Sequence, residues 1–138
     1  MSRLRLETKT PAAPDRPEIT DEEAAAMARA VVNLFDKWGV KHEPARVLLG
    51  GLSTSTWDRW KNKKIGRVSH DQKSRLAHLM SIHKALRIIF RDPERGYGWI
   101  KRPNDAFGGM SALDVMLRGD LTDIITVRAY LDAERGAW

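Results

Sequence analysis

The sequence predicts an all-α protein in which a helix-turn-helix bundle is followed by a small helical C-terminal domain. Apolar residues recur at intervals of three and four, which is the spacing of amphipathic helices. Ser, Thr and Asp stand before these segments, and glycine or proline follows them, as at helix starts and stops. No segment alternates apolar and polar residues as a half-buried strand does.

The first predicted helix opens with a capping box formed by Thr20 and Glu23, and Gly39 ends it. Its apolar stripe consists of Met27, Val31, Leu34, Phe35 and Trp38. Residues 1–17 contain three prolines and mixed charges, and we expect them to form a disordered arm.

Two short helices follow, over residues 43–49 and 53–62. Pro44 is tolerated at the first position of a helix, and Gly50-Gly51 forms a tight turn. Ser53 caps the second short helix, in which Trp57 and Trp60 share one face. We expect both tryptophans to belong to the core rather than to stack on bases.

A long helix opens at Ser69, with Gln72 three residues later, and stops before Pro93. An irregular glycine-containing stretch precedes a helix that Ser111 caps, and the last helix covers residues 122–134. We therefore divide the chain into the arm (1–17), a helix-turn-helix domain (18–68), a connecting and dimerisation helix (69–92) and a C-terminal domain (93–138).

Composition limits the class of protein. The chain has 138 residues, enough for one ordinary domain or two very small ones. The absence of cysteine excludes disulfides, cysteine-based zinc sites and a catalytic thiol. No apolar run reaches the ~18 residues that a membrane helix needs, and the first ten residues lack the apolar core of a secretory signal. We expect a small, soluble, cytoplasmic protein with no membrane partner.

The net charge of +6 is unevenly distributed. Residues 37–104 carry sixteen Lys and Arg against five Asp and Glu, a net charge of +11. Residues 18–36 have a net charge of −4, and residues 105–138 have −3. A polyanionic partner is therefore expected for the middle of the chain only, although a charged solvated surface is the simpler alternative.

The basic middle contains the helix-turn-helix pattern. Small polar residues at the start of the second short helix are suited to the DNA major groove, while the tryptophans anchor its other face. The cations that follow are suited to phosphates, which supply affinity rather than sequence discrimination. The predicted DNA-binding residues are Ser53, Thr54, Ser55, Thr56, Arg59, Lys61, Lys63, Lys64 and Arg67.

Two stretches resemble one family. The helix-turn-helix resembles the Xre-like type through Leu52, Ser53, Ser55, Thr56, Trp57, Arg59, Trp60 and Asn62. It departs at Lys63, where that family usually has glycine. The C-terminal third is similar to the Xre/MbcA/ParS toxin-binding domain through Trp99, Pro103, Asn104, Phe107, Gly108, Gly109, Leu113, Asp114, Leu117, Gly119, Val127, Arg128, Tyr130 and Leu131.

The resemblance implies an antitoxin of a RES–Xre toxin–antitoxin system. Such an antitoxin binds a cognate RES-domain toxin, which degrades NAD or transfers its ADP-ribose, and covers the toxin's active site. The complex usually represses its own operon by binding operator DNA, and the antitoxins tend to be homodimers within a larger complex. The alternative is a stand-alone transcription regulator whose C-terminal domain dimerises or senses a ligand. A third possibility is a protein-interaction module whose helix-turn-helix is purely structural.

The predicted toxin-binding residues are Lys101, Arg102, Asn104, Arg128, Tyr130, Leu131, Glu134, Arg135 and Trp138. Arg128 has an equally good structural interpretation, an ion pair with Asp132 four residues later. Asn104 can cap the following turn as well as contact a partner. Trp138 is expected to dock on its own domain or on a partner.

The sequence does not predict an enzyme. His42, His70, His78 and His83 do not match metal-ligand spacings, and there is no phosphate-binding loop. Gly96 and Gly98 form only a fragment of a dinucleotide-binding motif. We therefore expect no catalytic residue, metal or cofactor.

Overall fold

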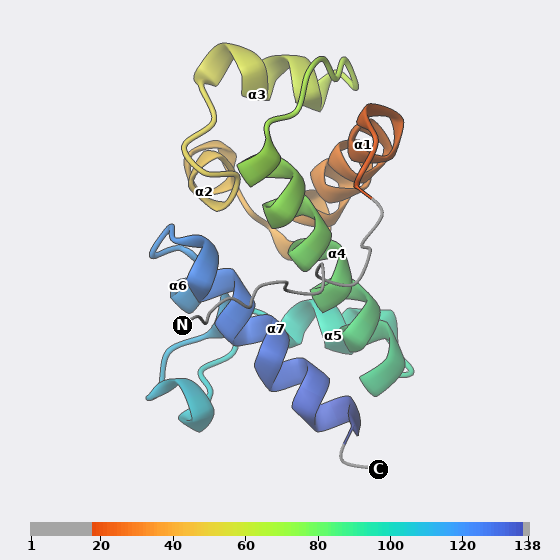
Figure 1. The fold of residues 1–138 in the computed structure, drawn as a ribbon. Helices are drawn as coiled ribbons and strands as arrows, with labels where there is room; N and C mark the ends of the chain where they lie inside the picture. Colours follow the sequence, from red (N-terminus) through yellow and green to blue (C-terminus); the bar gives the residue numbers. More distant parts are fainter. Residues whose placement is uncertain (1–17, 137–138) are drawn as a thin grey trace, which may run out of the picture.

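The structure is a computed structural model that describes residues 18–136, so the predicted arm (1–17) and Trp138 lie outside the described residues. The predicted all-α fold is confirmed (Figure 1). The helices are α1 (Asp21–Trp38), α2 (His42–Leu48), α3 (Thr54–Lys61), α4 (His70–Ile89), α5 (Pro93–Trp99), α6 (Ala112–Met116) and α7 (Leu121–Gly136), with a 3₁₀ turn, η2 (Asp105–Phe107). Pairing between Pro103 and Ser111 is an isolated bridge, and the described residues contain no strand.

The first three helices and the start of α4 enclose an aromatic core. Trp38 and Trp60 are almost completely buried, and the ring of Phe35 lies 6.3 Å from that of Trp57. Trp57 is itself only 4% exposed. The expectation that Trp57 and Trp60 are core residues is therefore confirmed.

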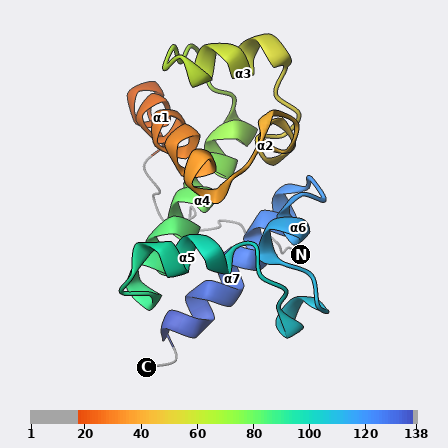
Figure 2. The same ribbon diagram turned by 180° about the vertical axis from the view of Figure 1, so that it is seen from behind.

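The helix α4 is shared by both halves of the molecule. It begins with the predicted capping box, in which Ser69 accepts from Gln72 N and the Gln72 side chain accepts from Ser69 N. Its first half packs against α1, and its second half packs against α5 and α7 (Figures 1 and 2). Since one helix supports both cores, the two halves are held in a fixed relation.

Two boundaries differ from those predicted. The second helix begins at His42, so Pro44 occupies its third position rather than its first. The stretch after Pro93, predicted as irregular, begins with the helix α5, in which Asp92 caps the start and Pro93 stands at the first position. Gly96 is buried there, and a Cβ at this position would lie 3.5 Å from the Cβ of Leu86.

The two halves of the molecule also contact each other at places that do not involve α4. The helix α1 touches α5, and a Cβ on Gly119 would lie 3.4 Å from the side chain of Val47 on α2. The helix α3 lies at one end of the molecule, far from α5 and α7 (Figure 2). Among the described residues no helix combines the length and apolarity needed to cross a membrane.

Candidate nucleic-acid and protein-binding surfaces

The turn between α2 and α3 is fixed by hydrogen bonds to its backbone. Gly50 and Gly51 have φ of +84° and +83°, a region that favours glycine. The Arg46 guanidinium donates to Leu52 O at 2.6 Å from one side. From the other side, Arg75 of α4 donates to Leu48 O at 3.3 Å. The angle between α2 and α3 is therefore set by side chains outside the turn.

The start of α3 carries the predicted hydroxyl groups. Ser53 is the N-cap, accepting from Thr56 N at 3.1 Å and contacting Thr56 Oγ1 at 2.9 Å. The Arg59 guanidinium donates to Thr56 Oγ1 at 3.1 Å. Thr54, Ser55 and Arg59 are exposed, so these are the side chains of α3 that are free to meet a groove.

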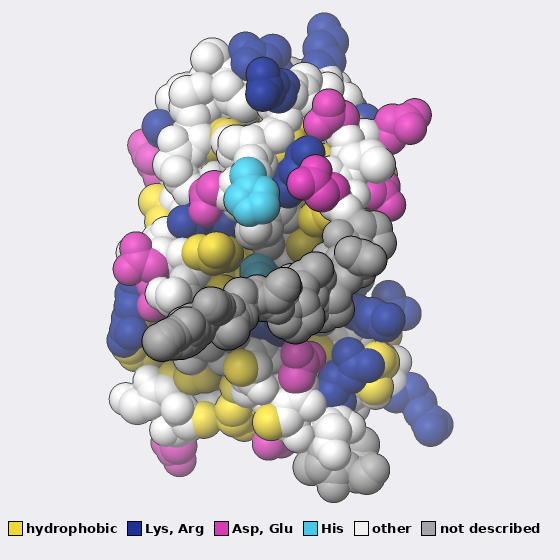
Figure 3. Space-filling model, in the orientation of Figure 1, with side chains coloured by type: hydrophobic (Ala, Val, Ile, Leu, Met, Phe, Trp, Pro, Cys, Tyr) yellow, Lys and Arg dark blue, Asp and Glu magenta, His cyan; other side chains and the backbone are white. Residues whose placement is uncertain are grey.

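Cations gather at the same end of the molecule, over α3 and the loop after it (Figure 3). Lys64 and Arg67 are exposed, and neither forms an ion pair within residues 18–136. Lys61 is half-buried, pairing with Asp58 at 3.4 Å and lying 3.4 Å from His42 Nδ1. The cations available for phosphates are thus chiefly Lys64 and Arg67, together with Arg59.

Lys63 has an unusual backbone conformation for a lysine, and its side chain contacts α1. It has φ of +65°, the left-handed region, and no other non-glycine residue of the described chain has positive φ. This is the position where the resembled pattern has glycine, which adopts the region without strain. The Lys63 ammonium turns back onto α1 and donates to Asn33 Oδ1 at 2.7 Å and to Arg29 O at 3.4 Å.

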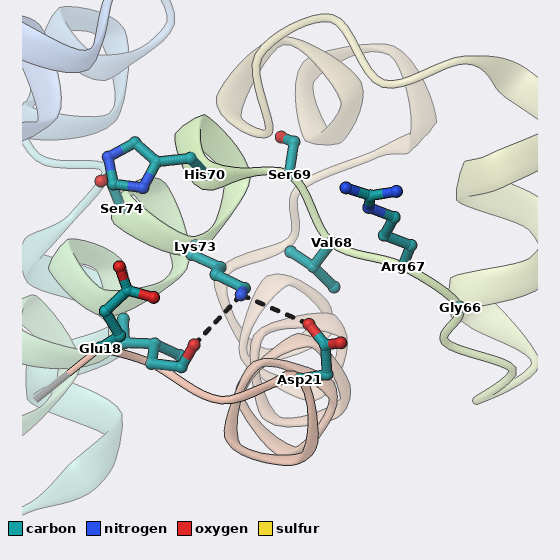
Figure 4. Close-up of a pocket in the computed structure, with 10 residues that line it drawn as sticks. Glu18, Asp21, Gly66, Arg67, Val68, Ser69, His70, Lys73 and Ser74 are labelled. Carbon is teal, nitrogen blue, oxygen red and sulfur yellow. Dashed lines mark hydrogen bonds and ion pairs between the residues drawn. The ribbon is translucent and has the colours of Figure 1, made fainter.

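A groove of about 920 Å³ lies between the starts of α1 and α4 (Figure 4). The Lys73 ammonium bridges it, donating to Ile19 O at 3.1 Å and pairing with Asp21 at 3.3 Å. Arg67 lines the same groove. Lys73 therefore fastens the start of α1 to α4 across this groove.

A second surface is centred on three partly exposed aromatic rings. Tyr130 of α7 stacks on Trp99 of α5 with ring centroids 6.1 Å apart, and Phe107 meets Tyr130 edge-on at 5.2 Å. Trp99 and Phe107 lie 6.4 Å apart. The rings fasten η2 and the end of α5 to the middle of α7, so Trp99 and Phe107 are packing residues.

Arg128 joins α7 to α4. Its guanidinium lies 3.4 Å from Asp132, the predicted ion pair, and 2.9 Å from His78 Nδ1 on α4. The side chain is still 36% exposed. Arg128 therefore orders the interface between α4 and α7 and also presents part of its surface to solvent.

The other predicted toxin-binding residues have different surroundings. Lys101 is exposed, with its ammonium over the C-terminal end of α1 beside Gly39. Asn104 caps η2, accepting from Ala106 N at 2.9 Å. Leu131 is 2% exposed, so its side chain is a core residue that a partner cannot reach in this conformation. Arg102 and Glu134 are exposed, Arg135 is half-buried, and Trp138 lies outside the described residues.

The roles of two residues that hold the helix-turn-helix in place, Arg75 and His42, were not predicted from the sequence. Arg75 is 7% exposed and pairs with Asp71 at 2.9 Å while donating to Leu48 O. Asp71 and Arg75 are four residues apart on one helix, and this spacing is the sequence pattern that indicates their ion pair. His42 accepts from the Trp57 indole N–H at 3.2 Å, and no local pattern connects residues fifteen apart.

One histidine has an altered basicity. Burial lowers the pKa of His83 below its usual value, and the nearby Arg87 guanidinium lowers it further. The His83 ring stacks on Tyr97 with centroids 6.3 Å apart. In the described part of the chain no cluster of three or more His, Asp or Glu is arranged to hold a metal ion.

The fold and these two surfaces define a helix-turn-helix protein with an appended helical domain. Comparison with known proteins specifies the class. The antitoxin Xre-like helix-turn-helix domain matches residues 17–81, and the antitoxin Xre/MbcA/ParS C-terminal toxin-binding domain matches residues 85–136. The chain is also 47% identical over 111 residues to the uncharacterized protein y4oB of Sinorhizobium fredii (strain NBRC 101917 / NGR234), covering 80% of this chain and 85% of that protein.

The chain belongs to the Xre/MbcA/ParS antitoxin family. It is an antitoxin with a helix-turn-helix domain and a toxin-binding domain, as the family resemblance implied. Both domains are of kinds that regulatory proteins carry.

Proposed function

We propose that this antitoxin neutralises a RES-domain toxin that consumes NAD, and that its C-terminal domain covers the toxin's active site. The observation that carries the proposal is the separation of two accessible surfaces on one rigid chain. The exposed hydroxyls and cations of α3 lie at one end, and the aromatic surface of α5, η2 and α7 lies at the other. Two partners can therefore be bound by separate surfaces.

The toxin-binding surface combines the exposed residues around α7 and η2. Arg128 is the central cation of this surface because it is ordered by His78 and still reaches solvent. A guanidinium is suited to the phosphate or carboxylate groups of a nucleotide-binding pocket. Lys101, Arg102, Tyr130, Glu134, Arg135 and Trp138 complete the surface, while Asn104 and Leu131 support it from within.

The DNA-binding surface represses the antitoxin's own operon in this proposal. Arg59 and Ser55 face the major groove, and Lys64 and Arg67 contact phosphates. A homodimer, for which the first turns of the connecting helix 69–92 supply contacts, presents two copies of α3 to a palindromic operator.

The first experiment expresses the gene adjacent to this one, as the expected toxin gene, alone and together with this protein, and measures growth, cellular NAD and co-purification. We expect the toxin alone to deplete NAD and stop growth, and the wild-type antitoxin to reverse both effects. Arg128→Ala is expected to release toxin activity while operator binding is retained. If the wild-type protein neither rescues growth nor co-purifies with the toxin, the proposal is wrong and a stand-alone regulator is the better interpretation.

The second experiment measures operator affinity against salt concentration. Arg59→Ala should weaken binding, and Lys64→Ala should reduce the slope of log affinity against log salt by about 1. Lys63→Ala is the matched comparison, since its ammonium already contacts Asn33 and should alter the slope less. Unchanged affinity in all three variants would indicate a purely structural helix-turn-helix.

A further inference from the structure

A basic ridge at the end of α4 belongs to neither surface described above. We define it as Lys84, Arg87, Ile88 and Arg91, all exposed. The first three lie on the face of α4 opposite the residues that the helix buries in the core. Figure 3 shows Lys and Arg side chains collected in this region, at the lower right of the view. Arg95 is nearby, but its guanidinium lies over the Phe90 ring at 6.0 Å.

Within the described part of the chain, the cations of the basic ridge have no polar side-chain partner. Lys84, Arg87 and Arg91 form no side-chain hydrogen bond or ion pair there, although other cations of similar exposure do. Ile88 is 52% exposed, more than any other large hydrophobic side chain of the described residues. A cation in the last turn of a helix is favoured by the helix dipole, which explains Arg87. It does not explain an exposed isoleucine among three cations.

We propose that the basic ridge is a docking surface for the toxin, and that the toxin meets it with acidic side chains around an apolar pocket for Ile88. This inference rests on the proposed function. Arg87, Ile88 and Arg91 fall within the match to the toxin-binding domain. The ridge is also continuous with the end of the molecule formed by α5 and α7 (Figures 1 and 2). An apolar anchor with arginine around it is the composition typical of a protein interface.

Other occupants fit the geometry less well. Operator DNA bound at α3 is at the opposite end of the molecule from the ridge (Figure 1). A second copy that docks ridge to ridge about a two-fold axis opposes Arg87 and Arg91 to their own equivalents, and like charges in contact are unfavourable. An acidic surface on a different protein can reach the ridge without contacting α3, and it does not bring like charges together.

The experiment measures association and dissociation of the full chain with its toxin at several salt concentrations. The variants are Ile88→Ala and the double variant Arg87→Glu with Arg91→Glu. We expect the double variant to weaken toxin affinity by about tenfold or more, mainly through a slower, less salt-dependent association. Ile88→Ala should raise the dissociation rate. Operator affinity and oligomeric mass should stay unchanged in both. The double variant should have a slightly lower melting temperature, because an anion replaces a cation in the last turn of α4.

The matched control is Lys64→Glu with Arg67→Glu, which makes the same change in net charge at the opposite end. This control should lose operator affinity and keep toxin affinity. The inference is overturned if the ridge variants bind toxin as the wild type does, if the control weakens toxin binding equally, or if the ridge variants lose DNA binding or oligomeric mass instead. Failure of the wild-type chain to bind toxin refutes the proposed function and this inference together.

Discussion

The strain at Lys63 can be measured by comparing two variants at that position, Lys63→Gly and Lys63→Ala. Both variants remove the ammonium contact with Asn33, and they differ only in the Cβ at a φ of +65°. An L-residue in the left-handed region costs about 1–2 kcal/mol, and the greater freedom of glycine in the unfolded chain offsets about 0.4–1 kcal/mol. Lys63→Gly should therefore be the more stable variant by roughly 0.5–1 kcal/mol.

Urea and thermal unfolding followed by circular dichroism provide the assay. For a chain of this size the difference corresponds to roughly 2–4 °C in melting temperature. The control is the same pair of substitutions at Lys64, whose φ is not positive. There alanine should be the more stable residue, so the order of the two variants reverses. Equal stability of the two Lys63 variants, or greater stability of Lys63→Ala, would refute the reasoning.

Three further substitutions test how the helix-turn-helix and α4 are held together. Gly50→Ala should be more destabilising than Gly51→Ala. A Cβ at position 50 would lie 2.8 Å from a carboxylate oxygen of Asp71, whereas a Cβ at position 51 would meet open space. A similar loss of unfolding free energy in both variants would contradict this. Arg75→Met should lower the free energy of unfolding by about 1–3 kcal/mol, because Leu48 O loses a buried hydrogen-bond donor. A stability equal to wild type would show that the hydrogen bond from Arg75 to Leu48 contributes nothing. His83 has a lowered pKa in the folded state, so the unfolded chain binds more protons as pH falls below about 6.5. Stability should therefore fall more steeply with acid in wild type than in His83→Gln, as measured by urea unfolding between neutral and mildly acidic pH; parallel pH profiles would contradict the prediction.

Helix starts were predictable from sequence because their signals are local. Thr20 with Glu23 and Ser69 with Gln72 form the two capping boxes, with both reciprocal bonds present. A side chain that satisfies a backbone N–H three residues away depends on little else in the fold. The helix-turn-helix and its buried tryptophans followed from the same short-range patterns. The helix α5 also carries such a signal at Asp92 and Pro93, but its two glycines obscured it because they are poor helix formers.

The surroundings of the candidate site residues could not be predicted in this way. Lys63 contacts Asn33 thirty residues away, and Arg128 contacts His78 fifty residues away. Partners at such separations are chosen by how helices pack, and periodicity gives only the face on which a residue lies. Leu131 illustrates the limit, since the pattern placed it on an apolar face and the fold buries that face against the chain itself.

The helix α4 explains how one small chain can serve two partners. Its first turns hold the helix-turn-helix through Arg75, its middle meets α7 through His78, and its end carries the basic ridge. A helix of 20 residues spans about 30 Å, so the two ends are farther apart than the width of a DNA groove. In the proposed function, a toxin bound at the far end leaves α3 accessible. In the proposed function this separation is what allows the antitoxin–toxin complex, and not only the free antitoxin, to occupy the operator.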